Sequence, residues 1–107
     1  MPARRVEFLA VAGAELQAAA AWYAERDMAV ARKFVSDVQR MTSLIARQPG
    51  IGAPWSDERL LVPVRRVPVT RFPYQIMYVE GDIVQIIALA HTRRRAGYWL
   101  GRLSDVP

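Results

Sequence analysis

Apolar and polar residues alternate in some stretches of the chain and recur every three to four residues in others. The first pattern predicts strands and the second predicts helices. Residues 4–9 alternate loosely and predict a short first strand, whereas residues 12–26 are rich in alanine and predict a helix. Residues 28–47 carry apolar side chains at helical spacing, and Asp27 is suited to cap that second helix. Because almost nothing separates the two helices, they should form an antiparallel hairpin.

The second half of the chain predicts strands. Residues 49–59 hold two prolines and two glycines and should form an irregular connection. Residues 60–69 are strand-like but contain two prolines, which favours an edge or bulged strand because proline has no N–H to donate. Residues 74–79 alternate, and the turn at residues 80–82 leads into residues 83–90, an apolar run typical of a buried central strand.

Together these elements predict the order β-α-α-β-β-β in a single domain spanning residues 1–107. This order indicates an α+β fold, in which a mostly antiparallel sheet packs against an N-terminal helical hairpin. With 107 residues, 52% of them hydrophobic, the chain can bury one core but is too short for two domains.

The net charge of +5 lies entirely in the second half of the chain. Residues 1–58 hold seven basic and seven acidic side chains, whereas residues 59–107 hold eight arginines and three acidic side chains. This asymmetry favours an acidic or polyanionic partner for the second half. Arginine outnumbers lysine by 14 to 1, a bias that a GC-rich genome would also produce. The position of the charge is therefore more informative than the type of basic residue.

Several chemistries lack the residues they need. There are no cysteines and only one histidine, and the sequence has neither an HExxH motif nor a glycine-rich phosphate loop. We therefore expect no cofactor and no metal site. No apolar stretch is long enough for a signal core or a membrane span, so we expect a cytoplasmic protein that does not contact a membrane.

The remaining candidates are arginines and aromatic residues around the last three strands. They are Arg65, Arg66, Arg71, Arg93, Arg94 and Arg95, with His91, Tyr74, Tyr78, Tyr98 and Trp99. Arginine binds phosphate bidentately and aromatic rings stack on bases, so the set suits single-stranded nucleic acid. In RNA cleavage, arginine could stabilise the transition state while histidine or tyrosine moves protons. A surface that docks an acidic protein explains the arginines equally well, and core packing explains the aromatic residues.

The sequence resembles the RelE/ParE superfamily of bacterial type II toxins over nearly its whole length, from Val6 to Trp99. The matching segments are Trp22-Tyr23, Ala31-Arg32-Lys33-Phe34, Pro49-Gly50, residues 64–69 (VRRVPV), residues 71–78 (RFPYQIMY) and residues 90–94 (AHTRR). The long helical hairpin and the Phe-Pro-Tyr segment are closer to the ParE-like branch. The RelE-like catalytic pattern also includes lysines, and the only lysine here is Lys33.

The resemblance implies a growth-arresting toxin of a plasmid-stabilization type, which inhibits DNA gyrase and forms a hetero-oligomer with a cognate antitoxin. The charge asymmetry of the chain predicts that this antitoxin is acidic. One alternative is a RelE-like endonuclease that cuts mRNA on the ribosome, and another is an inactive relative that acts as a binding module. For the endonuclease the resemblance implies Arg71 and Arg93 as catalytic residues and, with a spacing that differs by about one residue, Tyr98. His91 is a further catalytic candidate because histidine can move protons. For binding to a target or antitoxin we assign Arg65, Arg66, Arg94, Arg95 and Trp99.

Overall fold

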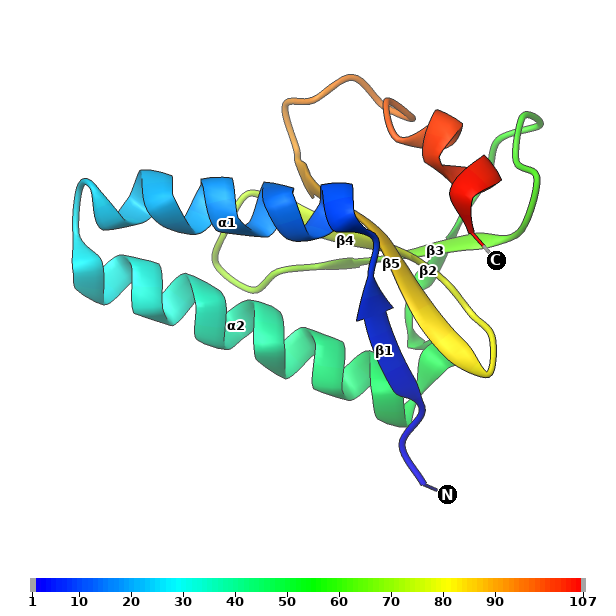
Figure 1. The fold of residues 1–107 in the computed structure, drawn as a ribbon, viewed down its shortest axis with the longest axis horizontal. Helices are drawn as coiled ribbons and strands as arrows, with labels where there is room; N and C mark the ends of the chain where they lie inside the picture. The colour runs from blue at the N-terminus through cyan, green and yellow to red at the C-terminus, as the bar shows by residue number, and fades with distance from the viewer. Residues whose placement is uncertain (1, 107) are drawn as a thin grey trace.

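A hairpin of two helices packs against one face of a mixed sheet in the computed structural model, which describes residues 2–106 (Figure 1). The elements in chain order are β1 (Arg5–Phe8), α1 (Ala10–Ala24), α2 (Met28–Arg47), the 3-10 helix η1 (Pro49–Ile51), β2 (Ala53–Trp55), β3 (Val64–Pro68), β4 (Tyr74–Val79), β5 (Ile83–His91) and the 3-10 helix η2 (Leu100–Asp105). The predicted α+β fold is confirmed.

The strands form one sheet in the order β1-β5-β4-β3-β2. β1 runs parallel to β5 and the other neighbours are antiparallel, so the sheet is mostly antiparallel as predicted. Met77 of β4 pairs with Ala88 of β5, and the next residue of β4, Tyr78, pairs with Ile86. Ile87 of β5 therefore has no partner in β4 and forms a bulge. Both faces of β5 are covered, and β5 is a buried interior strand, as its apolar sequence indicates.

The core between the helices and the sheet follows the helical periodicity of α2. Asp27 caps α2 by accepting hydrogen bonds from the N–H groups of Ala29 and Val30, at 2.9 and 3.4 Å. Phe34 and the other buried apolar residues of α2 then face the sheet. α1 differs from α2 because its sequence is apolar on all sides, so part of its apolar surface remains exposed.

A second core lies on the opposite face of the sheet, and the sequence did not predict the segment that covers it. Trp99 directly precedes η2 and Leu103 lies within it. Both pack there against Met77, Ile87 and other buried residues of β3, β4 and β5. Trp55 closes the edge of this core, with its ring edge-on to Trp99 at 5.4 Å. The sheet is therefore the middle layer of three.

The structure corrects four sequence-based boundaries. Residues 49–59 are not wholly irregular, because they contain η1 and β2. β2 pairs with β3 and takes the edge position, so β3 is an interior strand that begins at Val64 and not at residue 60. The two prolines are accommodated because Pro63 precedes β3 and Pro68 is its last residue. α1 begins and ends two residues earlier than predicted, and β5 extends to His91.

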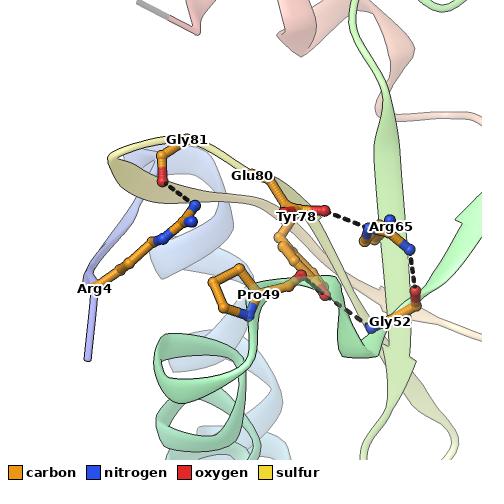
Figure 2. Close-up of polar contacts among 7 residues, drawn as sticks. All are labelled: Arg4, Pro49, Gly52, Arg65, Tyr78, Glu80 and Gly81. Carbon is orange, nitrogen blue, oxygen red and sulfur yellow. Dashed lines mark hydrogen bonds and ion pairs between the residues drawn. The ribbon is translucent and has the colours of Figure 1, made fainter. Parts of the chain in front are cut away.

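The hydroxyl of Tyr78 fixes the connection that leads into β2 (Figure 2). It donates to the carbonyl oxygen of Pro49 at 2.6 Å and accepts from the N–H of Gly52 at 2.9 Å. A side chain at position 52 would not fit, because a Cβ there would lie 2.7 Å from the Tyr78 hydroxyl. Glycine thus permits the close approach that anchors β2 to the sheet.

Replacing Tyr78 by phenylalanine is expected to lower the free energy of unfolding by about 1–3 kcal/mol, because it leaves buried backbone groups of the connection without partners. Urea unfolding followed by circular dichroism measures the change. The matched control is Tyr74→Phe, whose hydroxyl has no hydrogen bond within residues 2–106, and its effect should stay below about 0.5 kcal/mol. Equal losses in the two variants would contradict the anchoring role.

Candidate binding site

The turn that follows β5 contains three consecutive arginines, and we call residues 92–97 the arginine turn. His91 starts this turn: its Nδ1 accepts from the N–H of Arg93 at 3.0 Å, and its carbonyl oxygen accepts from the N–H of Arg94 at 3.0 Å. The His91 ring also meets Tyr74 edge-on at 5.0 Å. These contacts give His91 a structural role in shaping the turn.

A network around Glu15 of α1 holds the segment that follows the arginine turn. The Glu15 carboxylate accepts from the hydroxyl of Tyr98 at 2.6 Å and from two guanidinium nitrogens of Arg102 at 2.7 and 3.2 Å. It also accepts from the N–H of Leu89 at 3.1 Å. β1 pairs with β5 only as far as Ile86. Beyond Ile86 the Glu15 carboxylate, and not a carbonyl oxygen of β1, accepts the hydrogen bond from the N–H of Leu89. One carboxylate therefore ties α1, β5 and the C-terminal segment together.

Tyr98 contributes to the site as a neutral hydroxyl with a covered ring. Burial raises the pKa of Tyr98 well above its ordinary value, and the hydrogen bond to the Glu15 carboxylate raises this pKa further. The guanidinium of Arg94 lies over the ring at 4.0 Å, a cation–π contact that orients this arginine. Tyr98 is thus a positioning group and is poorly suited to act as a general base.

All four tyrosines should resist ionisation in the folded protein. Burial is the main cause that raises the pKa of Tyr23, Tyr74, Tyr78 and Tyr98 above the ordinary value of 10.0. A raised pKa means that the folded state keeps its protons longer, so the stability contributed is complete below pH 10 and is lost as the pH rises above it. We expect phenolate absorbance to appear only above pH 10 and together with unfolding. A tyrosine that titrates at its ordinary pKa while the fold persists would contradict this expectation.

A groove of about 510 Å³ runs between α1 and the arginine turn. Its lining includes Glu15, Trp22, Tyr23, Tyr74, His91, Arg93, Arg94 and Tyr98. Tyr23 packs on Phe34 and Phe72, whereas Trp22 is 52% exposed and stacks with Arg26 at 3.6 Å. The groove brings three of the four predicted catalytic residues, His91, Arg93 and Tyr98, to one place.

Arg71, the fourth predicted catalytic residue, does not line this groove. It lies in the turn between β3 and β4 with φ of 69°, and its guanidinium forms an ion pair with Asp37 of α2 at 3.4 Å. Arg40 shares the same carboxylate. Asp37 is buried, so this pair of arginines neutralises a charge that would otherwise be costly at the edge of the core. Arg71 therefore has a structural role as the ion-pair partner of Asp37.

The two predicted binding residues of β3 lie in different surroundings. Arg65 is engaged within the chain: it donates to Glu80 at 2.5 Å and to the carbonyl oxygen of Gly52 at 2.8 Å (Figure 2). Arg66 is exposed and its guanidinium lies 5.4 Å from the ring of Trp55. Arg66 therefore remains available to a partner, whereas the charge of Arg65 is already compensated.

Trp99 was assigned to binding from the sequence, but it is only 2% exposed and lies in the second core. Its large apolar ring is buried by the turn into η2, so it forms no part of the surface. Sequence reasoning also missed Glu15 and Arg102. Glu15 is the only charged residue between Ala10 and Ala24, and a single carboxylate on an apolar helix was a usable signal.

Within residues 2–106, no group of histidine and acidic side chains is arranged to hold a metal ion. No helix in that range combines the length and the apolar character that a membrane span requires. The site is therefore defined by guanidinium groups, aromatic rings and hydrogen-bond donors. Such groups bind anions and acidic surfaces through charge and hydrogen bonding.

Comparison with known proteins identifies the family. A model described as the ParE toxin of the type II toxin–antitoxin system parDE matches residues 6–96. The chain belongs to the ParE toxin family. The resemblance to the ParE-like branch is thereby confirmed. No curated protein sequence matches the chain.

The fold of this ParE family member also occurs among solved structures. A chain from the chromosomal ParDE TA system of P. aeruginosa superimposes with a TM-score of 0.67 at 22% sequence identity. The alignment covers 82% of the present chain and 95% of the other. At this level of identity the similarity establishes a shared fold, in which a helical hairpin packs on a sheet.

Proposed function

We propose that this ParE family member is a toxin that arrests growth by inhibiting DNA gyrase, and that an acidic antitoxin neutralises it in the cytoplasm. The observation that carries the proposal is the arginine turn of a ParE family chain: within residues 2–106 its three arginines, Arg93, Arg94 and Arg95, form no ion pair with a carboxylate. Exposed, unpaired positive charges in a turn that directly follows a strand favour docking to another macromolecule.

The arrangement of the predicted catalytic residues supports docking over RNA cleavage. General acid–base chemistry needs a group whose pKa is close to the working pH. Tyr98 has a raised pKa and its proton is held by Glu15, and the Nδ1 of His91 already accepts a hydrogen bond from the turn. Arg71 is bound to Asp37 outside the groove. The residues therefore do not assemble into a complete acid–base pair with phosphate stabilisation.

The ribosome-dependent endonuclease is the second candidate, and one observation favours it. His91, Arg93 and Tyr98 line the same groove, where a phosphodiester could reach all three. Primer extension on translated mRNA from cells that express the toxin separates the two candidates. New cuts within codons would support the endonuclease, and an unchanged cleavage pattern alongside growth arrest would support gyrase as the target.

The proposed antitoxin should be acidic, because the uncompensated arginines need opposite charges and the complex would be a hetero-oligomer. Co-expression with the product of the neighbouring reading frame tests this. Changing Arg93, Arg94 and Arg95 together to alanine should weaken capture of that product by at least about tenfold. A matched triple variant on α2, Arg32→Ala, Lys33→Ala and Arg47→Ala, removes the same charge from exposed positions and should retain capture. Equal capture by both triple variants would count against the arginine turn.

Induction of the toxin without its neighbour tests the proposed function in cells. We expect growth to stop and a reporter plasmid to become relaxed, because inhibited gyrase no longer adds negative supercoils. Growth that continues at the normal rate with folded toxin present would leave only an inactive relative that acts as a binding module.

A further inference from the structure

A second, smaller cleft lies on the face of the sheet that points away from the helical hairpin. We call it the basic cleft. Its volume is about 170 Å³. Gln75 and Met77 of β4 and Ala90 of β5 line it, and Met77 and Ala90 belong to the core on that face. Further lining residues are Arg66 beside Trp55, and Thr92, Arg94, Arg95, Ala96 and Gly97 from the arginine turn.

The three arginines that line the basic cleft have no carboxylate partner among residues 2–106. Arg66, Arg94 and Arg95 are all exposed and form none of the ion pairs in that range. Nearby arginines behave differently, because Arg59 is paired with Asp57 and Arg65 with Glu80. Ion pairs thus compensate Arg59 and Arg65, whereas the three arginines of the cleft remain without a carboxylate partner among residues 2–106.

Two of the three guanidinium groups of the basic cleft lie against aromatic rings. Arg94 lies over Tyr98 at 4.0 Å, and Arg66 lies 5.4 Å from the ring centre of Trp55. Holding a long side chain in advance reduces the entropy that binding costs. The backbone adds donors: the N–H groups of residues 95, 96 and 97 form no hydrogen bond within residues 2–106. Successive free N–H groups in a turn are typical of anion-binding loops.

The same contacts indicate which part of a nucleic acid would bind. Arg94 lies over the ring of Tyr98, Arg66 lies 5.4 Å from the ring centre of Trp55, and Trp99 is buried. A base that stacked on these ring faces would therefore have to displace an arginine. A site that has guanidinium and N–H donors but no stacking platform suits phosphate oxygens. The single-stranded mode suggested by the sequence, in which bases stack on exposed rings, is therefore not favoured at this cleft.

We infer that the basic cleft binds the phosphate backbone of duplex DNA, through Arg66, Arg94, Arg95 and the free N–H groups of the turn. This inference rests on the proposed function, because DNA is held by gyrase during its reaction and would lie beside a bound toxin. The toxin would then contact both the enzyme and its DNA. Recognition through phosphates alone carries no base sequence information, so binding would be independent of DNA sequence.

Fluorescence anisotropy with a short, labelled DNA duplex and the purified chain of 107 residues tests the basic cleft. Changing Arg66, Arg94 and Arg95 together to alanine should weaken binding at least about tenfold at low salt. The dependence of log K on log salt should also become shallower by about 2 to 3, because roughly 0.9 is lost with each phosphate contact. The triple variant on α2, Arg32→Ala, Lys33→Ala and Arg47→Ala, carries the same net charge and should bind DNA as the unmodified chain does.

Equal weakening by the two triple variants would overturn the cleft assignment, because net charge alone would then explain binding. Binding of polyglutamate through the same three arginines without binding of DNA would also overturn it, in favour of an acidic protein. Far-UV circular dichroism confirms that each variant is folded. Gyrase supercoiling is measured on the same preparations. Inhibition of gyrase without DNA binding would overturn this inference alone, whereas DNA binding without inhibition would overturn the proposed function and support the cleft.

Discussion

Replacing Glu15 by alanine is expected to lower the free energy of unfolding by about 3 kcal/mol, a large loss for a surface-proximal side chain. The physical reason is that the Tyr98 hydroxyl and the Leu89 N–H would lose their acceptor, and the Arg102 guanidinium would lose its carboxylate and keep only the carbonyl oxygen of Ile87. Leaving partly buried donors and a charge unpaired costs far more than losing an exposed ion pair. Urea unfolding measures the loss, and hydrogen exchange should show faster opening of residues 92–106.

The matched control for this prediction is Glu25→Ala, at the other end of the same helix. The side chain of Glu25 is 77% exposed and its contact with Arg26 is long, at 3.8 Å, so its removal should change the free energy of unfolding by less than about 0.5 kcal/mol. If Glu15→Ala were as mild as Glu25→Ala, the carboxylate would not be the group that ties the C-terminal segment to α1.

Replacing Phe34 by alanine is expected to lower the free energy of unfolding by about 3–5 kcal/mol. Phe34 is 0% exposed, and its ring centre lies 5.0 to 5.2 Å from those of Tyr23, Phe72 and Tyr74. Its truncation leaves a cavity between α2 and the sheet and removes all three aromatic contacts. Thermal or urea unfolding measures the effect.

Met28→Ala provides the control for Phe34, because Met28 begins the same helix and is 53% exposed. We expect it to change the free energy of unfolding by less than about 1 kcal/mol. A small effect of Phe34→Ala, comparable with that of Met28→Ala, would mean that the aromatic cluster does not hold the hairpin on the sheet.

The sequence predicted the elements whose patterns are long and local. α2 was located to the residue because Asp27 caps it, and its apolar positions recur over five turns at helical spacing. β5 was recognised because a long apolar run, interrupted by Gln85, needs cover on both sides. β2 escaped prediction because it has only three residues, one of them proline, and its position depends on the Tyr78 hydroxyl from a distant strand.

The sequence located the arginines of the site but not their partners. Arg71 is compensated by Asp37, which is 34 residues away, and Tyr98 is held by Glu15, which is 83 residues away. No local pattern encodes such contacts, because they depend on how the helices lie on the sheet. For the same reason the sequence could not separate the available charges of Arg66, Arg94 and Arg95 from the engaged charge of Arg65.

The measurement that most directly tests the central claim is a supercoiling assay with purified DNA gyrase, relaxed plasmid and an excess of the folded toxin. The proposed function predicts that supercoiling falls as toxin is added, and that changing Arg93, Arg94 and Arg95 to alanine largely restores it. The α2 triple variant should inhibit like the unmodified chain. Full supercoiling in the presence of excess folded toxin would contradict the account.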